Sequence, residues 1–274
     1  MIEFGFDSFG KQWVPPSGGA PVGPTYDPTA QALFSRFAVD PTTARKNLIN
    51  DRIIAGKAST WWAKLDAIWV HAAHAPEAAR LNWLGDRFNC IPINNPTFTV
   101  DRGYMGNGSS SYLDTQFNPY VEASKGSKYQ RLSASLGIRS NTDNSSLGSL
   151  AGFWDGAKGT TLNPRRTSTW EARVNQASLR TIANPEGSSI GMFVIGRRSA
   201  TEMFMAKNGT VSVTNTSNAA AELANGNLML GAISASSLRA CQFSMGFIGA
   251  GLTDAEVTDI YNWFEVYRIA VGVV

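Results

Sequence analysis

The stretch YQRLSASLGIRS, residues 129–140, decides the fold class of this chain. Apolar residues occupy alternate positions, namely Leu132, Ala134, Leu136 and Ile138. The polar and charged residues Arg131, Ser133, Ser135 and Arg139 lie at positions between them. Successive side chains of a strand point to opposite faces, so this alternation is typical of a half-buried antiparallel strand. The sequence therefore predicts a sheet here.

Further strand patterns follow this stretch, and Gly, Ser, Asn and Thr dominate from Asn94 onward. Residues 170–174 repeat the alternation, with Trp170, Ala172 and Val174 on one parity. Residues 190–196 are apolar on both parities, which predicts a strand covered on two sides. Later strands are expected at 227–234 and 241–251. These patterns favour an all-β domain over residues 94–274.

Turn and capping motifs mark the limits of several elements. Asn107-Gly108 and Asn208-Gly209 each predict a type I′ hairpin. Thr253 to Glu256 forms a capping box, which predicts a closing helix. We expect the apolar face of that helix to pack against the edge or the outside of the sandwich.

Residues 27–90 predict a helical collar. Asp27-Pro28 and Asp40-Pro41 each signal a helix start, with the second helix ending near Gly56. A third helix is expected from Ser59 or Thr60, because apolar residues then recur at helical spacing: Trp61, Leu65, Ile68, Trp69 and Ala72.

The first 26 residues predict an extended N-terminal arm and tether. An apolar head, with Ile2, Phe4, Phe6 and Phe9, precedes a segment rich in proline and glycine. Such a segment cannot bury a core, and the head is suited to docking on another subunit.

Composition excludes several functions. The chain has 274 residues and a net charge of +3 without a polybasic stripe, so we expect no nucleic-acid partner. It has no apolar run of about 18 residues, and its first residues do not resemble a signal peptide, so membrane insertion is not expected. Cys90 and Cys241 are far apart; buried free thiols are favoured, with one long-range disulfide as the alternative.

Two resemblances sharpen this interpretation. Residues 106–119 (GNGSSSYLDTQFNP) and 243–261 (FSMGFIGAGLTDAEVTDIY) resemble the opening and closing parts of laminin-G-like and concanavalin-like jelly rolls. Residues 44–84, followed by PTFTVDRGYMGNGSSSYLDT at 96–115, resemble LamG-like structural proteins of alphaproteobacterial phages and prophages, described as tail, fibre or decoration proteins.

The resemblance implies a mainly β, concanavalin-like sandwich with an N-terminal helical region and a C-terminal helix. It also implies a non-enzymatic virion structural protein that displays its jelly roll on the particle surface. We expect the arm to bind other virion proteins, a homo-oligomer with a trimer favoured, and contact with host surface glycans. The alternative is a carbohydrate-binding receptor-recognition module, and a polysaccharide-degrading tail enzyme is more distant.

Sugar binding needs an aromatic ring beside polar groups. The best candidate cluster is Trp154 and Asp155, with Arg165 and Trp170 beyond the following loop. Trp154 fits the core equally well.

No catalytic residue, metal ligand or cofactor is assigned. His71 and His74 have a spacing that suits zinc on a helix, but ordinary histidines are favoured. The loop Asn141–Asn144 offers calcium ligands, although an ordinary turn is the preferred interpretation. No close pair of acids marks a glycosidase, and no GxSxG motif marks a serine hydrolase.

Overall fold

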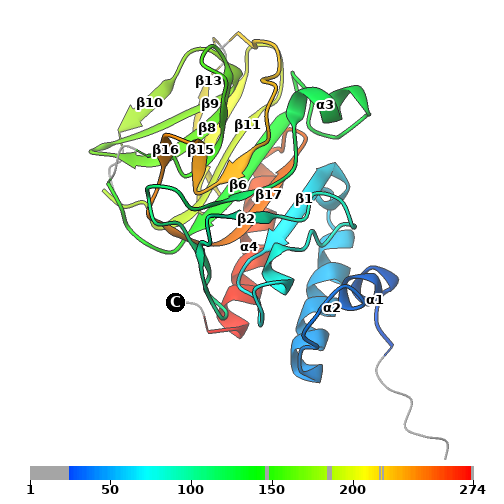
Figure 1. The fold of residues 1–274 in the computed structure, drawn as a ribbon. Coiled ribbons are helices and arrows are strands. Elements are labelled where there is room, and N and C mark those ends of the chain that lie inside the picture. Colours follow the sequence, from blue (N-terminus) through cyan, green and yellow to red (C-terminus); the bar gives the residue numbers. More distant parts are fainter. Residues whose placement is uncertain (1–24, 146–147, 184–186, 216, 218, 273–274) are drawn as a thin grey trace, which may run out of the picture.

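The computed structural model describes residues 25–272, apart from 146–147, 184–186, 216 and 218. Most of the predicted arm, residues 1–24 with the apolar head, lies outside the described residues. The fold is a mainly β, concanavalin-like antiparallel sandwich, with helices before it and after it (Figure 1). No described helix is long and apolar enough to cross a membrane.

One sheet, which we call the covered sheet, has the order β13-β12-β11-β6-β17-β4-β3, and β1 also pairs with β17. Its strands are β1 (Leu65–Val70), β3 (Thr97–Thr99), β4 (Gly103–Met105), β6 (Ala134–Ser140), β11 (Gly191–Arg197), β12 (Met203–Lys207), β13 (Thr210–Asn215) and β17 (Gln242–Gly249).

The second sheet, which we call the open sheet, has the order β10-β9-β8-β7-β14-β5-β2. Its strands are β2 (Ile91–Ile93), β5 (Tyr112–Asp114), β7 (Ala151–Trp154), β8 (Gly159–Arg166), β9 (Thr169–Gln176), β10 (Arg180–Ala183) and β14 (Met229–Leu230). A separate small hairpin joins β15 (Ala232–Ser234) to β16 (Ser237–Leu238).

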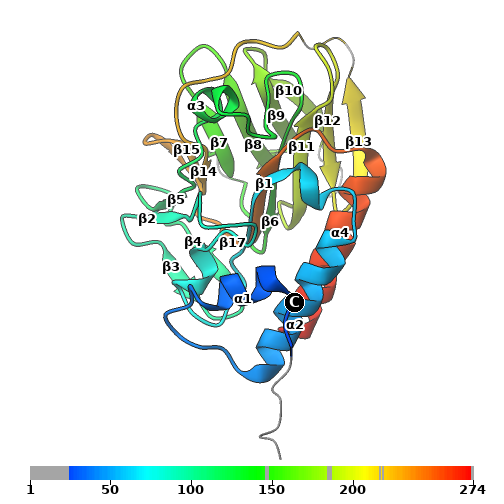
Figure 2. The same ribbon diagram turned by 90° about the vertical axis from the view of Figure 1, so that its right-hand side faces the viewer.

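Four α-helices complete the described fold: α1 (Pro28–Phe34), α2 (Thr43–Lys57), α3 (Pro119–Ser124) and α4 (Asp254–Ala270). Helices α2 and α4 run side by side (Figure 2), and the Trp263 indole donates a hydrogen bond to the Arg52 carbonyl at 2.6 Å. They cover the outer face of the covered sheet, so the molecule has three layers: helices, covered sheet and open sheet.

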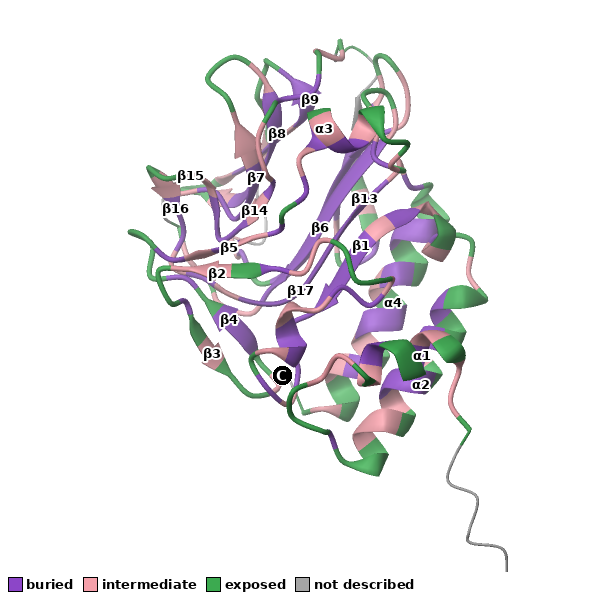
Figure 3. Ribbon diagram, turned by 45° about the vertical axis from the view of Figure 1, so that its right-hand side comes forward, coloured by how far each residue is buried: buried purple, intermediate pink, exposed green. Residues whose placement is uncertain are grey.

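Two apolar cores separate these layers. On β11, Phe193 and Ile195 pack between the sheets, whereas Met192 and Val194 pack under the helices. Both parities of this strand are therefore buried, as its sequence predicts. The neighbouring strands β6 and β17 are also buried along most of their length (Figure 3, purple). The closing helix is also confirmed, with its capping box at Thr253 and its apolar face on the outside of the covered sheet.

The central strand β6 differs from the prediction. Its apolar residues face the sandwich core, but Ser135 and Arg139 on the other parity are buried too. The strand is not half-buried, because the helical layer covers its second face. The polar residues of β6 predicted that this face is exposed to solvent. The sequence pattern of one strand does not show that helices from other parts of the chain cover it.

The predicted third helix is wrong. Residues 65–70 form strand β1, which pairs antiparallel with β17. Trp69 belongs to the core between the sheets, whereas Ile68 and Val70 belong to the core under the helices. A strand buried on both faces is apolar at nearly every position, so its pattern also matches a helical stripe. The range 27–90 therefore contributes a strand to the sandwich.

The helix starts are confirmed at one position and shifted at the other. Asp27 caps α1, and its carboxylate accepts from the Thr29 amide at 2.8 Å. The second helix is capped by Thr42 and not by Asp40, because the Thr42 hydroxyl accepts from the Arg45 amide. It ends at Lys57, close to the predicted Gly56.

Only one of the two predicted hairpins forms. Asn208 and Gly209 have φ of 49° and 80° and join β12 to β13, as a type I′ turn requires. Asn107-Gly108 connects β4 to β5, which belong to different sheets. There the Asn107 side-chain oxygen accepts from the amides of Ser109, Ser110 and Ser111, which turns the chain from one sheet to the other.

Candidate functional site

The outer face of the open sheet is the sheet face that the helices α2 and α4 do not cover. The two apolar clusters of the described residues lie between the sheets and beneath the helices, and neither lies on this outer face. The β15–β16 hairpin lines part of this face, and Thr161 and Asn163 at its centre are each 4% exposed, so a ligand would bind at the half-buried and exposed side chains around them.

Strand register places Trp154 and Arg173 together on this face. Gly152 of β7 pairs with Thr161 of β8, and Thr161 pairs with Arg173 of β9, so positions 152, 161 and 173 share one face. Trp154 lies two residues after Gly152 and has the same parity. The Arg173 guanidinium carbon is 3.8 Å from the centroid of the Trp154 ring, which is a cation–π contact.

A polar hollow of about 220 Å³ lies beside this pair. Strands β8 and β9 supply most of its lining, and the β15–β16 hairpin supplies Ile233 and Ser237. The lining combines hydroxyl, amide, guanidinium and carboxylate groups with two aliphatic side chains: Ser149, Thr161, Asn163, Arg166, Glu171, Arg173, Leu179, Ile233 and Ser237.

The polar and charged groups of the hollow differ in their ion-pair and hydrogen-bond partners. Arg166 and Glu171 form an ion pair at 3.3 Å. The Asn163 side chain accepts a hydrogen bond from the buried Arg239 at 2.6 Å, which fixes its orientation. Glu171 is the one carboxylate among the described residues that line the hollow.

The predicted cluster is not one site. Trp154 pairs with Gly159, and Gly159 lies six residues before Arg165 on β8. Trp154 and Arg165 are therefore about 20 Å apart in the direction of the strand. Arg165 instead forms an ion pair with Asp143. Trp170 is 4% exposed and packs edge-on against Phe193 in the sandwich core, so it is unavailable to a ligand.

Asp155 lies next to Trp154 but holds a turn. Its carboxylate accepts from the amides of Ala157 and Lys158 and pairs with the Lys158 ammonium at 3.1 Å. Burial alone would raise the pKa of Asp155, but these hydrogen bonds outweigh it and hold the pKa below its ordinary value.

Sequence reasoning missed Glu171 and Arg173. Both residues lie between Trp170, Ala172 and Val174, the apolar positions of the same strand. This alternation could have placed them on the outer face. Once one parity is assigned to the core, the other must face outward.

The two histidines are not brought together as a metal site. His71 directly follows β1 and is fully buried, and its Nδ1 lies 2.7 Å from the Ala79 carbonyl oxygen. His74 contacts the Val39 carbonyl oxygen instead. Within the described ranges, no group of three or more His, Cys, Asp or Glu residues is placed to hold a metal ion. Cys90 and Cys241 are both buried free thiols.

The loop at 141–144 does not fit a calcium site. One Asp143 oxygen accepts from the Ser189 amide, and the other pairs with Arg165. The Asn141 side-chain oxygen accepts from the Ser244 hydroxyl. A cation would have to displace an arginine, so the ordinary turn is the better interpretation.

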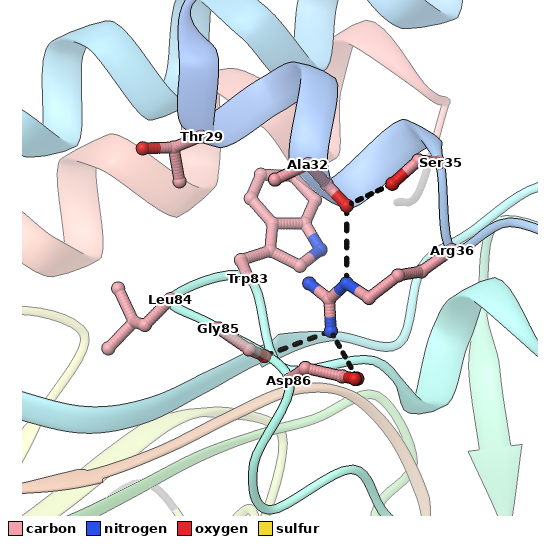
Figure 4. Close-up of a pocket in the computed structure, with 8 residues that line it drawn as sticks. All are labelled: Thr29, Ala32, Ser35, Arg36, Trp83, Leu84, Gly85 and Asp86. Atoms are coloured by element: carbon pink, nitrogen blue, oxygen red, sulfur yellow. Dashed lines mark hydrogen bonds and ion pairs between the residues drawn. The ribbon is translucent and has the colours of Figure 1, made fainter.

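A second hollow lies between α1 and the loop at residues 83–86 (Figure 4). The Arg36 guanidinium spans it and donates to the carbonyls of Ala32, Gly85 and Asn82. These hydrogen bonds hold α1 against the loop, so Arg36 has a structural role.

Comparison with known proteins identifies the class of fold. The sialidase of Trypanosoma rangeli is 12% identical, with a TM-score of 0.53 over 85% of this chain and 40% of the sialidase chain. The binding domain of botulinum neurotoxin serotype D is 10% identical, with a TM-score of 0.50 over 73% of this chain and 51% of that chain. This chain thus spans only about half or less of either neighbour. The likeness shows the β-sandwich fold alone.

Domain 4 of AbnA, an extracellular GH43 arabinanase of Geobacillus stearothermophilus, is covered over 98% of its length, at 14% identity and a TM-score of 0.48. No protein-family model matches this chain, and no curated protein is similar to it in sequence.

Proposed function

We propose that this chain is a carbohydrate-binding β-sandwich module and that its ligand face is the outer face of the open sheet beside Trp154. The observation that carries the proposal is the polar hollow next to the stacked Trp154 and Arg173. Planar groups pack on the apolar face of a sugar ring, and hydroxyl, amide and charged groups bond its hydroxyls. The Trp154 ring supplies the planar group, and the hollow beside it supplies the polar and charged groups.

The lining favours binding over hydrolysis. Glycoside hydrolysis by the usual mechanism needs two carboxyl groups about 5 to 10 Å apart. Glu171 is the one carboxylate among the described lining residues, and it forms an ion pair with Arg166. We therefore keep the expectation that the chain is not an enzyme as part of the proposal.

Substitution of Trp154 tests the ligand face. The wild type should bind at least one glycan on a broad array, and Trp154→Ala should weaken that binding at least tenfold, measured by titration calorimetry. Tyr120→Ala is the matched control, because Tyr120 is an exposed aromatic on α3, outside the hollow. Equal affinity of wild type and Trp154→Ala would place the ligand elsewhere, and a wild type that binds no glycan would refute carbohydrate binding.

The wider setting that we propose is display on a phage particle, as a fibre, spike or decoration protein. The support is the resemblance of residues 44–84 and 96–115, together with the arm composition of residues 1–26. The arm would bind other virion proteins, and the chain would assemble as a homo-oligomer, with a trimer favoured. Mass spectrometry of purified particles should detect the chain, and native mass spectrometry should give a trimer; a stable monomer absent from particles would contradict this setting.

A further inference from the structure

The cation of Arg173 is the least satisfied charged group of the hollow. Arg166 has Glu171 as its ion-pair partner, whereas Arg173 has no carboxylate within ion-pair distance among the described residues. Its Nη1 reaches only the Ala177 carbonyl, at 3.4 Å, and its buried Nε has no hydrogen-bond partner there. A guanidinium has five N–H groups, so most of the Arg173 donors have no protein acceptor among the described residues.

The surroundings of Arg173 increase the cost of this unpaired charge. The guanidinium lies over the Trp154 ring, which removes water from one of its faces. Burial lowers the pKa of Arg173, and the charge of Glu171 only partly offsets the effect. An arginine remains charged in spite of such a shift, so Arg173 is a partly dehydrated cation without an ion-pair partner among the described residues.

The charge balance of the hollow points the same way. Its described lining contains two arginines and one glutamate, a balance of +1, and the glutamate is already paired. Carboxylates and arginines form two parallel hydrogen bonds, which are stronger than bonds between neutral groups. A ligand with a carboxylate would therefore supply what Arg173 lacks.

We propose that the glycan bound at this face is acidic and that a sugar carboxylate binds Arg173, which the Trp154 ring holds in place. This inference rests on the proposed carbohydrate-binding function and narrows its ligand class. Hydroxyl groups of the same or the next sugar would bond to the half-buried Ser237 and the exposed Arg166 along the hollow. Trp154 is the positioning group, and Arg173 selects the charge.

Matched pairs of glycans test this selection. The probes are oligogalacturonate, oligomannuronate and oligoglucuronate, each compared with its carboxyl-reduced, neutral form by titration calorimetry. We expect at least one acid to bind at least tenfold more tightly than its neutral form, because the neutral form leaves the cation unpaired. Added salt should weaken the acid form and leave the neutral form nearly unchanged, because salt screens the ionic contact.

Three variants separate charge selection from a bracing role of Arg173. Arg173→Gln should lose the acid preference and still bind the neutral form, and Arg173→Lys should keep part of the preference because it keeps the charge. Arg102→Gln removes one exposed positive charge from the β3–β4 turn and should change nothing. If Arg173 only braced Trp154, Arg173→Gln would weaken acid and neutral forms equally, and this would overturn the proposal.

The remaining outcomes distinguish the two proposals. A wild type that binds acid and neutral forms equally, or prefers the neutral form, overturns the acidic ligand and leaves carbohydrate binding intact. A wild type that binds neither these probes nor any glycan on the array overturns both.

Discussion

His71 has no access to solvent in the folded chain. Its ring lies among those of Trp69, Tyr104 and Phe243, and its Nε2 has no hydrogen-bond partner among the described residues. Burial lowers the pKa of His71 from 6.5 to about 4, although the contact with the Ala79 carbonyl opposes this. The ring is therefore neutral in the folded state at neutral pH.

We predict that His71 makes the fold sensitive to acid. Below pH 6.5 the unfolded chain binds a proton at this position more readily than the folded chain, so stability is lost as the pH falls from 6.5 towards 4. A shift from 6.5 to about 4 corresponds to about 3 kcal/mol of unfolding free energy. Urea unfolding of the wild type and of His71→Asn, at several pH values in this window, measures the difference.

The comparison has an internal control. The asparagine side chain of the His71→Asn variant would keep a donor for the Ala79 carbonyl and lose the titration, so the unfolding free energy of this variant should vary less with pH. His74→Asn, at the other histidine, should retain the slope of the wild type. Identical slopes for wild type and His71→Asn would contradict the prediction.

At the scale of elements, β1 shows how a side chain helps to close an edge strand, beside the bond from the Trp83 amide to the Ile68 carbonyl. The Asn82 side-chain oxygen accepts from the amides of Ile68 and Leu84, and its nitrogen donates to the carbonyls of Asp66 and Arg87. Asn82 is 2% exposed. It thus bonds the free edge of β1 in the way that a neighbouring strand would.

We predict that Asn82→Ala costs about 3 kcal/mol of unfolding free energy, because it leaves buried amide and carbonyl groups unsatisfied. Chemical denaturation measures the loss. Asn225→Ala is the control: Asn225 is exposed and makes one side-chain hydrogen bond with Asn118, so its loss should stay within about 0.5 kcal/mol. A cost below about 1 kcal/mol for Asn82→Ala would mean that water satisfies the edge.

The elements also show what the sequence could and could not predict. Local signals were sufficient for the Asn208-Gly209 turn, the Thr253 capping box and the buried strand β11, since each depends on neighbouring residues. They failed for β1 and for the second face of β6, because both depend on layers that other parts of the chain provide.

The candidate site was only partly predictable for the same reason. Trp154 was identified from its residue type, but its contact with Arg173 requires the register of three strands, which no local pattern encodes. The sequence alone groups Trp170 with Trp154, because the two are close along the chain. The strand parity of Trp170 places it in the core.

At the scale of the whole molecule, the same strands pack against the helices on one face and against the open sheet on the other. The helical layer and the sandwich are therefore not expected to unfold independently. Each of β1, β11 and β17 contributes side chains to both the core between the sheets and the core under the helices. In β17, Ile248 belongs to the first core and Phe247 to the second. Loss of either core would expose one complete face of these strands.

We therefore predict that residues 25–272 unfold in one cooperative transition, although the sequence suggested separate regions at 27–90 and 94–274. Single-tryptophan reporters test this: Trp263 lies in the helical layer and Trp170 in the sandwich core. Their fluorescence transitions in urea should coincide with each other and with far-UV circular dichroism, as two-state unfolding requires. An earlier transition at Trp263 would show that the helical layer is a separate unit, because its core would then melt while the core between the sheets persisted.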